Sequence, residues 1–495
     1  MAWLIVVALC VPLVASFCSY AVSFNVARAV TVVAGAVTFI TSLALIPAVL
    51  DHGTVSAGGG WLRADALSMV FLVATAFLYA TTAIFAGGYL HLAQGPAGRL
   101  YSRRFYAGLN LFCWSLVAAP LVNGLALLWV MIEITTVVSA LLVAIEDTEG
   151  ATEAAWKYVL LASLGLGIAL LATIIMYYAG TTVFGSSYGL SFGKVLSGAA
   201  HFSPGAVRVA FVLAVLGFGT KMGLVPVHTW LPDTHSEAPT PVSALLSGSL
   251  LATSFYAILR FYQIAVRTLG PTFPRDTLLV FGVASLLLAA LYMLSQRDLK
   301  RLLAYSSVEH MGIMAIGMSF GAPIAIVGVL LHVIAHATAK GTAFYGAGSV
   351  IRKFATKDLA AIRGGIGILP WSGPLLLASV LGLSAMPPSG IFRSEFLIVS
   401  GGLADSHDVV AAILVILVTV AFFGLSWSTT KVLASPDPTP STGTSGVVPS
   451  PGEVSPWIVV SMLLGIAALV LLGVHPPGQL SELLHHAASQ LASPS

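Results

Sequence analysis

The sequence has 495 residues, of which 58% are hydrophobic and only 8% charged, and its formal net charge is +3. A soluble domain is about 25% charged, so this composition indicates a protein whose solvent is lipid. The small, dispersed charge argues against nucleic acid as a partner. Three cysteines without CxxC spacing are too few to hold an iron–sulfur cluster, and we expect no cofactor in this chain.

The chain contains about fourteen apolar runs, each near the roughly 20 residues that a membrane span requires. Their hydrophobicity does not alternate, so they predict helices rather than barrel strands. The first run lacks the basic start of a signal peptide, and we interpret it as a retained helix. The predicted spans are 2–22, 29–50, 66–88, 105–120, 121–144, 155–178, 206–228, 240–266, 277–295, 300–320, 323–350, 371–400, 408–431 and 456–474.

Lysine and arginine are concentrated in the loops that follow spans 1, 3, 9, 11 and 13. By the positive-inside rule, these loops face the cytoplasm and both termini lie outside. The loops hold Arg28; Arg99, Arg103 and Arg104; Arg297, Lys300 and Arg301; Arg352, Lys353, Lys357 and Arg363; and Lys431.

Helix breakers interrupt spans 7 and 12. Pro226 follows Lys221 in span 7, and Pro387 and Pro388 precede Glu395 in span 12. Paired breaks of this kind predict two inverted five-helix repeats, spans 4–8 and 9–13, although proline and glycine are also common in ordinary membrane helices. The expected organisation is spans 1–3 in 1–104, the repeats in 105–267 and 268–432, a flexible Pro/Ser linker in 433–455, and in 456–495 the last span followed by a short amphipathic helix.

Two opposite charges lie inside apolar segments of the first repeat. An ionisable residue at a helix centre costs about 2.5–3.5 kcal/mol on insertion scales, so each one is a functional hypothesis. Glu133 in span 5 and Lys221 in span 7 would neutralise each other if the two spans pack together. A static ion pair that fixes packing is the structural alternative, although such pairs stabilise poorly.

A polar stripe marks the second repeat. His332, His336 and Lys340 recur every four residues in span 11 and so share one helix face, while His310 lies in span 10 beside Glu309, which we leave unassigned. The i, i+4 histidines also suit a metal, but HExxH is absent and the lysine would repel a cation, so we expect no metal. Imidazole titrates near neutrality, which favours a proton relay.

Four polar residues surround the stretch HTWLPDTHSEAP after the first break. They line the mouth of a half-channel or belong to a solvated loop, and the sequence does not choose between these readings. The four are His228, Asp233, His235 and Glu237. Arg260, Arg393 and Asp298 lie near span ends, where snorkelling or pairing in a loop is inexpensive.

The sequence resembles the proton-conducting antiporter-like subunits shared by respiratory complex I, membrane-bound hydrogenases and multi-subunit cation/proton antiporters, in particular the hydrogenase-4 component F-like subunits. The resemblance covers roughly residues 121–400. The matching stretches are IEITTVVSALLV, EAAWKY, GFGTKMGLVPVHTWLPDTHSEAPTPVSALLSG, QRDLKRLLAYSSVEHMG, LHVIAHATAK and MPPSGIFRSEF.

This resemblance implies a fourteen-helix subunit with broken helices 7 and 12, and a role for each buried charge. Glu133 and Lys221 match the family's glutamate–lysine pair, His310 and His336 its central polar axis, Lys340 the lysine of an HxxxK pattern, and Glu395 its terminal acid. Many relatives also carry a lysine in span 8, where this chain has Ala252. Ser247, Thr253 or water would then bridge Lys221 and His310.

The function implied is proton translocation, without catalysis by this chain, inside a respiratory complex of the cell membrane. The partners implied are other membrane subunits and a peripheral redox arm that contains iron–sulfur clusters. Three alternatives stay open: a subunit of an Na⁺(K⁺)/H⁺ antiporter, a non-conducting anchoring subunit, and a membrane enzyme that binds a metal through His332 and His336.

Overall fold

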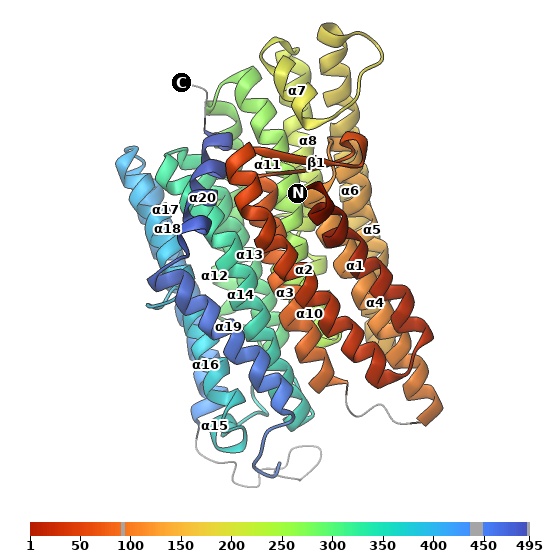
Figure 1. Cartoon of the computed structure of the whole chain (residues 1–495). Coiled ribbons are helices and arrows are strands. Elements are labelled where there is room, and N and C mark those ends of the chain that lie inside the picture. The colour runs from red at the N-terminus through yellow and green to blue at the C-terminus, as the bar shows by residue number, and fades with distance from the viewer. Residues whose placement is uncertain (91–94, 436–448, 493–495) are drawn as a thin grey trace.

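The computed structural model describes residues 1–90, 95–435 and 449–492, nearly all of them in helices that run side by side (Figure 1). In this described part of the chain, eleven helical segments are long and apolar enough to cross a membrane. They are α1 (Ala2–Ala21), α2 (Phe24–His52), α3 (Ala66–Tyr89), α5 (Leu125–Val143), α6 (Glu149–Phe184), α8 (Pro204–Met222), α10 with α11 (Thr240–Leu245 and Leu251–Leu269), α12 (Thr272–Met293), α14 (Pro323–Phe354), α18 (Asp408–Ala434) and α19 (Pro456–Val474).

The remaining predicted spans are also helical. They correspond to α4 (Gly95–Leu121), to α13 (Leu299–Phe320) and to the pair α16 (Ser372–Leu383) and α17 (Gly390–Ala404). α4 and α13 are less apolar than the other two, because α4 carries Arg103 and Arg104 and α13 carries Glu309, His310 and several serines. The prediction of an all-α polytopic membrane protein with about fourteen spans is therefore confirmed. The assignment of spans 4–8 and 9–13 to inverted repeats, and the domain bounds, stay predictions.

Both predicted helix breaks are present. α8 ends at Met222, where Gly223 adopts a φ of 88°, and the short α9 (Trp230–Glu237) begins seven residues later. The second break separates α16 from α17, and the Ser389 hydroxyl accepts a hydrogen bond from the Phe392 backbone N–H to cap the new helix. Each break places a buried titratable group, Lys221 or Glu395, within about two turns of non-helical backbone.

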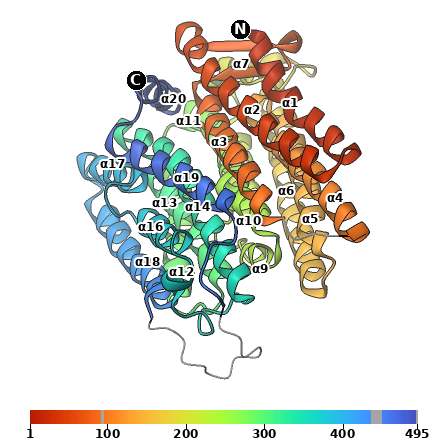
Figure 2. The same ribbon diagram turned by 60° about the horizontal axis from the view of Figure 1, so that its bottom comes forward.

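Several small elements cover one end of the bundle. An antiparallel hairpin, β1 (Thr54–Ala57) and β2 (Leu62–Asp65), pairs Thr54 with Asp65, and α7 (Phe192–Gly198) lies at the same end (Figures 1 and 2). Neither element was predicted. The two termini lie toward this end as well, as the positive-inside analysis requires, although which end faces the cytoplasm stays a prediction.

The predicted amphipathic tail is the helix α20 (Gly478–Leu491). Its apolar side, which includes Leu483 and Leu484, is buried against α3 and α14, whereas His485 and His486 are exposed. Residues 436–448, which make up most of the predicted linker, lie outside the described residues.

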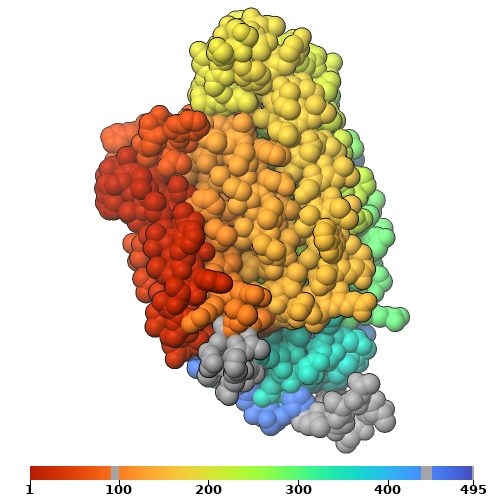
Figure 3. Space-filling model, turned by 90° about the vertical axis from the view of Figure 1, so that its right-hand side faces the viewer, coloured from red at the N-terminus to blue at the C-terminus, as the bar shows by residue number. Residues whose placement is uncertain are grey.

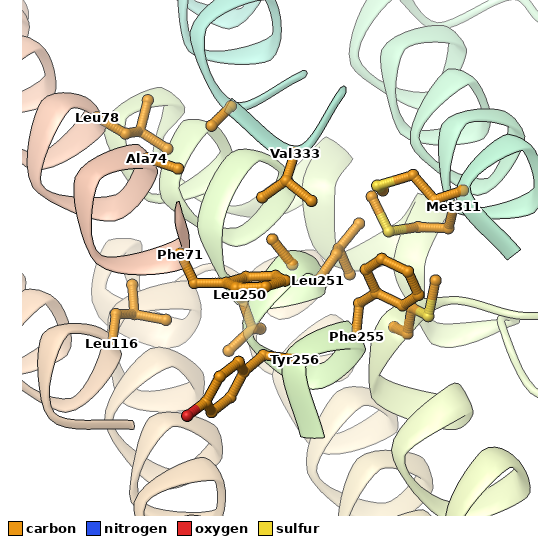
Figure 4. Packing of buried hydrophobic residues seen from close by; sticks show 14 of the residues in the cluster. Phe71, Ala74, Leu78, Leu116, Leu250, Leu251, Phe255, Tyr256, Met311 and Val333 are labelled. Atoms are coloured by element: carbon orange, nitrogen blue, oxygen red, sulfur yellow. The ribbon is translucent and has the colours of Figure 1, made fainter. Parts of the chain in front are cut away.

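Burial differs strongly between helices. α3, α11, α13 and α14 are buried along most of their length, while α1, α6, α18 and α19 expose apolar side chains such as Leu164 and Trp427. Figure 4 shows Phe71, Leu250, Phe255 and other side chains filling the space where the central helices meet. A polar group on α13 or α14 is therefore surrounded by protein rather than by lipid.

Of the two possibilities predicted for Arg260, snorkelling and pairing in a loop, the structure shows pairing. Its side chain is fully buried, and its Nη2 lies 2.6 Å from Asp65 Oδ1, so that α11 is tied to the hairpin. Burial alone would raise the pKa of Asp65, but the Arg260 guanidinium, the Arg63 guanidinium and the hydrogen bond from the Ser68 backbone N–H together outweigh it and lower this pKa to about 2. The buried guanidinium of Arg260 also lies over the rings of Phe192 and Tyr256, 4.5 and 4.9 Å from their centroids, and these cation–π contacts help to stabilise it in the interior.

Candidate functional site

Lys221 occupies the last turn of α8, which packs very closely against α6. A Cβ atom added to Gly217 would lie 2.5 Å from the Ala169 backbone nitrogen, and one added to Gly165 would lie 2.5 Å from Thr220. Only glycine permits this approach, and it holds the end of α8 deep in the bundle. The Lys221 side chain is fully buried as a result.

The Lys221 ammonium group donates to α5. Its acceptors are the Ile132 carbonyl oxygen, at 3.0 Å, and the Thr136 hydroxyl. Ile132 and Thr136 are four residues apart and so share one face of α5. An ammonium group in an apolar interior needs such partners, and here the helix backbone supplies one of them.

Glu133 lies beside this contact but forms no direct ion pair with Lys221 in the described part of the chain. Successive helix positions point about 100° apart, so Glu133 faces α6, where the Ser163 hydroxyl donates to its Oε1 at 3.2 Å. Its other carboxylate oxygen is buried without a hydrogen-bond partner among the described residues. The predicted direct contact between Glu133 and Lys221 is therefore not formed in this conformation. Lys221 contacts one face of α5, and Glu133 projects from the adjacent face.

The histidines of α13 and α14 form an ordered hydrogen-bonded chain with α17. His310 Nδ1 lies 3.0 Å from His332 Nε2, and His332 Nδ1 lies 2.9 Å from the Ser394 hydroxyl. The Ser394 hydroxyl donates its own proton to the Ile391 carbonyl oxygen at 2.8 Å, so it accepts from His332. Hydrogen bonding thus fixes the tautomers, because the proton must reside on Nδ1 of His332 and then on Nδ1 of His310.

At the start of this series of hydrogen bonds, one ring nitrogen of His310 has no partner among the described residues. His310 Nε2 is buried and has no partner among the described residues, and the ring of His336 lies 5.2 Å from the His310 ring, centroid to centroid. Both nitrogens of His336 are likewise buried and unpartnered. Buried polar atoms without protein partners are normally satisfied by ordered water, so this place favours hydration.

Glu395 closes the site on the side of α17. Its Oε1 lies 4.0 Å from His310 Nδ1. His310, His332 and Glu395 bring one ligand atom each within 4.8 Å of one another, which is a donor set that zinc accepts. The lone pair of His332 Nε2 is already used by His310, and the expectation of no metal stays a prediction.

Lys340 lies one helical turn beyond His336. It is fully buried, and it donates to the Leu303 carbonyl oxygen at 2.7 Å and to the Ser306 hydroxyl of α13. The next residue, Ser307, lies 2.7 Å from Ser247, oxygen to oxygen. Ser247 belongs to a five-residue π-helical turn, Leu246–Leu250, that joins α10 to α11, and π turns occur frequently at functional sites.

The three residues considered for the span 8 gap behave differently. Ser247 reaches α13 as described, whereas the Thr253 hydroxyl donates to the Ser249 carbonyl oxygen of its own helix and reaches no other helix. Ala252 is buried. Of these two hydroxyl groups, only that of Ser247 therefore hydrogen-bonds to another helix among the described residues, and which group bridges Lys221 and His310 stays a prediction.

The four-residue polar cluster divides into a buried half and a surface half. Asp233 and Glu237 are about one-third exposed and form ion pairs, Asp233 with Arg301 at 3.2 Å and Glu237 with Lys357 at 2.6 Å. His228 and His235 are instead buried. α9 is a short helix rather than a loop, so its two sides meet different surroundings.

His235 lies in the interval between the two lysines. Its ring contacts Phe344, one turn from Lys340 on α14, and Trp230, whose indole N–H donates to the Thr220 carbonyl oxygen beside Lys221. Both of its ring nitrogens are buried and lack partners in the described part of the chain. Of the four residues in this polar cluster, His235 is therefore the one whose ring lies between the surroundings of Lys221 and Lys340.

Hydroxyl groups are the functional contacts that the sequence did not single out. Thr136, Ser306 and Ser394 each contact a buried titratable side chain, and Ser163 contacts the partly buried Glu133. Ser394 directly precedes Glu395, but hydroxyls in membrane helices usually bond to their own backbone, so their spacing alone was no signal.

Comparison with known proteins places these features in a family. Residues 122–422 match the sequence model described as NADH:quinone oxidoreductase/Mrp antiporter, transmembrane. A hydrogenase-4 component F homolog of Methylacidiphilum infernorum is 36% identical over 372 residues, which cover 73% of this chain and 76% of that protein. NADH-quinone oxidoreductase subunit N of Desulforudis audaxviator is 31% identical over 364 residues, covering 72% of this chain and 70% of that protein.

Solved structures share the fold. The likeness to a chain of the Mrp complex from Dietzia sp. has a TM-score of 0.86 at 21% identity, and covers 100% of this chain and 98% of that one. The likeness to a chain of respiratory complex I from Thermus thermophilus has a TM-score of 0.79 at 23% identity, and covers 99% and 100%. The predicted resemblance is confirmed: the chain belongs to the NADH:quinone oxidoreductase/Mrp antiporter transmembrane family.

Proposed function

We propose that the chain is a proton-translocating membrane subunit of a redox-driven respiratory complex and that it takes no direct part in the redox reaction. Two relatives are named as parts of redox enzymes, one as a hydrogenase-4 component F homolog and the other as a subunit of NADH-quinone oxidoreductase. The proposed location is the cell membrane, with both termini outside.

The observation that carries the proposal is the ordered chain from His310 through His332 to Ser394. A proton that binds His310 Nε2 makes an imidazolium, which releases its Nδ1 proton to His332 Nε2. His332 in turn releases its own Nδ1 proton to the Ser394 hydroxyl, and the hydroxyl releases its proton, through water, to the Glu395 carboxylate, which has an oxygen within 4.8 Å of a ring nitrogen of His332. Rotation of the rings then restores the starting tautomers. Each imidazole accepts on one side and donates on the other, which is what a relay requires.

The rest of the proposed path supplies and removes this proton. Lys221 is the loading group, the unpartnered imidazoles of His235 and His336 mark hydrated intervals, and Lys340 connects them along α14. Glu395, 4.0 Å from His310 Nδ1, is the acceptor on the exit side. Glu133 lies near enough to Lys221 to change its proton affinity when either side chain turns, because an opposite charge favours the protonated amine.

The energy must come from a partner. Moving one proton against 100 mV costs about 2.3 kcal/mol. Three scattered cysteines leave this chain without an iron–sulfur cluster of its own. The proposed partners are therefore other membrane subunits and a peripheral redox arm that contains such clusters.

The test is proton uptake by liposomes that contain the whole complex, driven by its electron donor in sodium-free buffer. His332→Gln keeps a side chain of similar size but cannot relay, so we expect an assembled complex that no longer acidifies the liposomes. His486→Gln, on the exposed side of α20, is the matched control and should pump normally.

Two results would contradict the proposal. Normal acidification by His332→Gln would remove the histidine chain from the path. Proton movement that needs Na⁺ or K⁺ and no electron donor would instead identify the antiporter alternative.

A further inference from the structure

A groove of about 410 Å³ opens on the membrane-facing surface between α14, α17 and α20, at the end of the bundle that carries the termini. Its walls are almost entirely apolar. The side chains that form them include Val327, Leu331, Leu397 and Leu484.

The groove faces hydrocarbon rather than water. On α17, Phe396 is 61% exposed and Phe392 is 40% exposed, and Ile324 at the rim on α14 is 42% exposed. In a chain that spans a membrane, such exposed apolar side chains face lipid. An apolar groove of this volume that opens toward lipid offers the surroundings that an acyl chain requires.

The outer end of the groove is lined by hydrogen-bond donors and by no acidic side chain of the described residues. Arg393 donates through Nη1 to the carbonyl oxygens of Gly473 and Val474, at 3.2 and 3.3 Å, and its other N–H groups have no partner among the described residues. Ser481 and His485 of α20 line the same end. This is an unusual place for arginine, because the positive-inside bias leaves few cations at this end.

The start of α20 adds to the same positive character. The helix begins at Gly478, so the backbone N–H groups of its first three residues have no acceptor within the helix, and the positive end of the helix dipole lies beside Ser481. No acidic residue lies in that first turn. Arginine, a hydroxyl and helix N–H groups together are the donors that bind a phosphate.

We propose that this groove binds one membrane phospholipid, with its phosphate held by Arg393 and the first turn of α20 and one acyl chain lying between α14 and α17. The acyl chain ends against Leu331, the neighbour of His332 in the sequence. Such a lipid would bind whether or not the chain moves protons, because the site needs only a surrounding membrane, an apolar groove and a cationic end.

Native mass spectrometry of the full chain in its purified complex tests the proposal. Phosphatidylglycerol is compared with diacylglycerol of the same acyl chains, and inorganic phosphate is added alone in a third arm. The wild-type chain should bind one phosphatidylglycerol at least about tenfold more tightly than diacylglycerol, because a charge-assisted phosphate contact is lost in the latter. Inorganic phosphate alone should not bind.

Three variants locate the site. Arg393→Gln should weaken phosphatidylglycerol binding about tenfold and leave diacylglycerol binding unchanged, whereas Val327→Phe fills the groove and should weaken both. Arg267→Gln removes another arginine of this end, which donates to the Leu196 carbonyl oxygen away from the groove, and should change neither. Equal binding of the two lipids by the wild-type chain overturns the proposal without any variant. It is also overturned if inorganic phosphate binds alone, or if Arg393→Gln and Val327→Phe behave like Arg267→Gln.

Discussion

Replacing Lys221 by methionine should separate its role in transport from its role in folding. Methionine has nearly the same length and shape as lysine but carries no proton. If Lys221 loads the proton path, Lys221→Met should reduce acidification of liposomes to the background level while the subunit still assembles.

The expected effect on stability follows from the partners of the amine. Two charge-assisted hydrogen bonds are lost, at about 1.5–3 kcal/mol each. The desolvation of a buried ammonium, several kcal/mol, is also removed. The acceptors are not left unpaired, because the Ile132 carbonyl oxygen still accepts from the Thr135 hydroxyl at 2.6 Å and from the Thr136 hydroxyl at 3.3 Å. The free energy of unfolding should therefore change by no more than about 2 kcal/mol in either direction.

The assay combines fluorescence quenching of a pH-sensitive dye in liposomes with thermal unfolding in detergent. Lys194→Met is the matched control, since Lys194 is exposed on α7 and stacks only on the Phe184 ring, and it should pump normally. Pumping by Lys221→Met at the wild-type rate would refute a loading role. A variant that fails to assemble would refute the reasoning about stability, because it would mean that the Lys221 amine is required for folding.

Three further outcomes follow from individual contacts. Ser394→Ala removes the acceptor of an imidazole N–H, which costs about 1–3 kcal/mol, so it should slow proton flux about tenfold, and Ser394→Thr should restore it; equal flux in both variants would count against the ordered tautomers. Gly165→Ala should lower the unfolding temperature and the flux because its Cβ would lie 2.5 Å from a neighbouring side chain, while Gly167→Ala, with open space around it, should be neutral or slightly stabilising in the same thermal scan. Asp65→Asn leaves the buried Arg260 uncompensated and should cost about 3–5 kcal/mol near neutral pH. The folded pKa of about 2 lies below the ordinary 3.8, so this carboxylate stabilises the fold by about 2–3 kcal/mol above pH 4 and loses that contribution as the pH falls toward 2; melting curves of wild type and variant should therefore converge in acid.

Much of the fold could be predicted because membrane spans are governed by one strong rule. Length and hydropathy located the spans, and Pro226 and Pro387 located the breaks, since proline cannot continue a helix without losing a backbone hydrogen bond. The four-residue spacing of His332 and His336 correctly placed both on one face of α14. Hydropathy, proline positions and residue spacing are local properties, and local properties can be read directly from a single sequence.

The contacts of the site depend instead on how helices are rotated against each other. The sequence could not show that Ile132 and Thr136, rather than Glu133, face Lys221, because a rotation of 100° exchanges them. For the same reason Asp233 and His235, two residues apart, were grouped together although one reaches the surface and the other the interior. The hairpin and α7 were missed because short polar segments carry little periodicity.

The absence of a lysine in span 8 need not prevent proton transfer between the two halves of the proposed path. A third lysine near Lys221 and Lys340 would add another amine to a buried region that already holds two, and each protonated amine there carries a desolvation cost. His235 instead places a neutral imidazole in that interval, which can accept and donate a proton without carrying a permanent charge. The Ser247–Ser307 contact then needs only to hold α11 and α13 together around the intervening space. In the proposed path, the step between the two halves is therefore made by water and imidazole, and its rate should depend on hydration around His235 more than on any fixed charge.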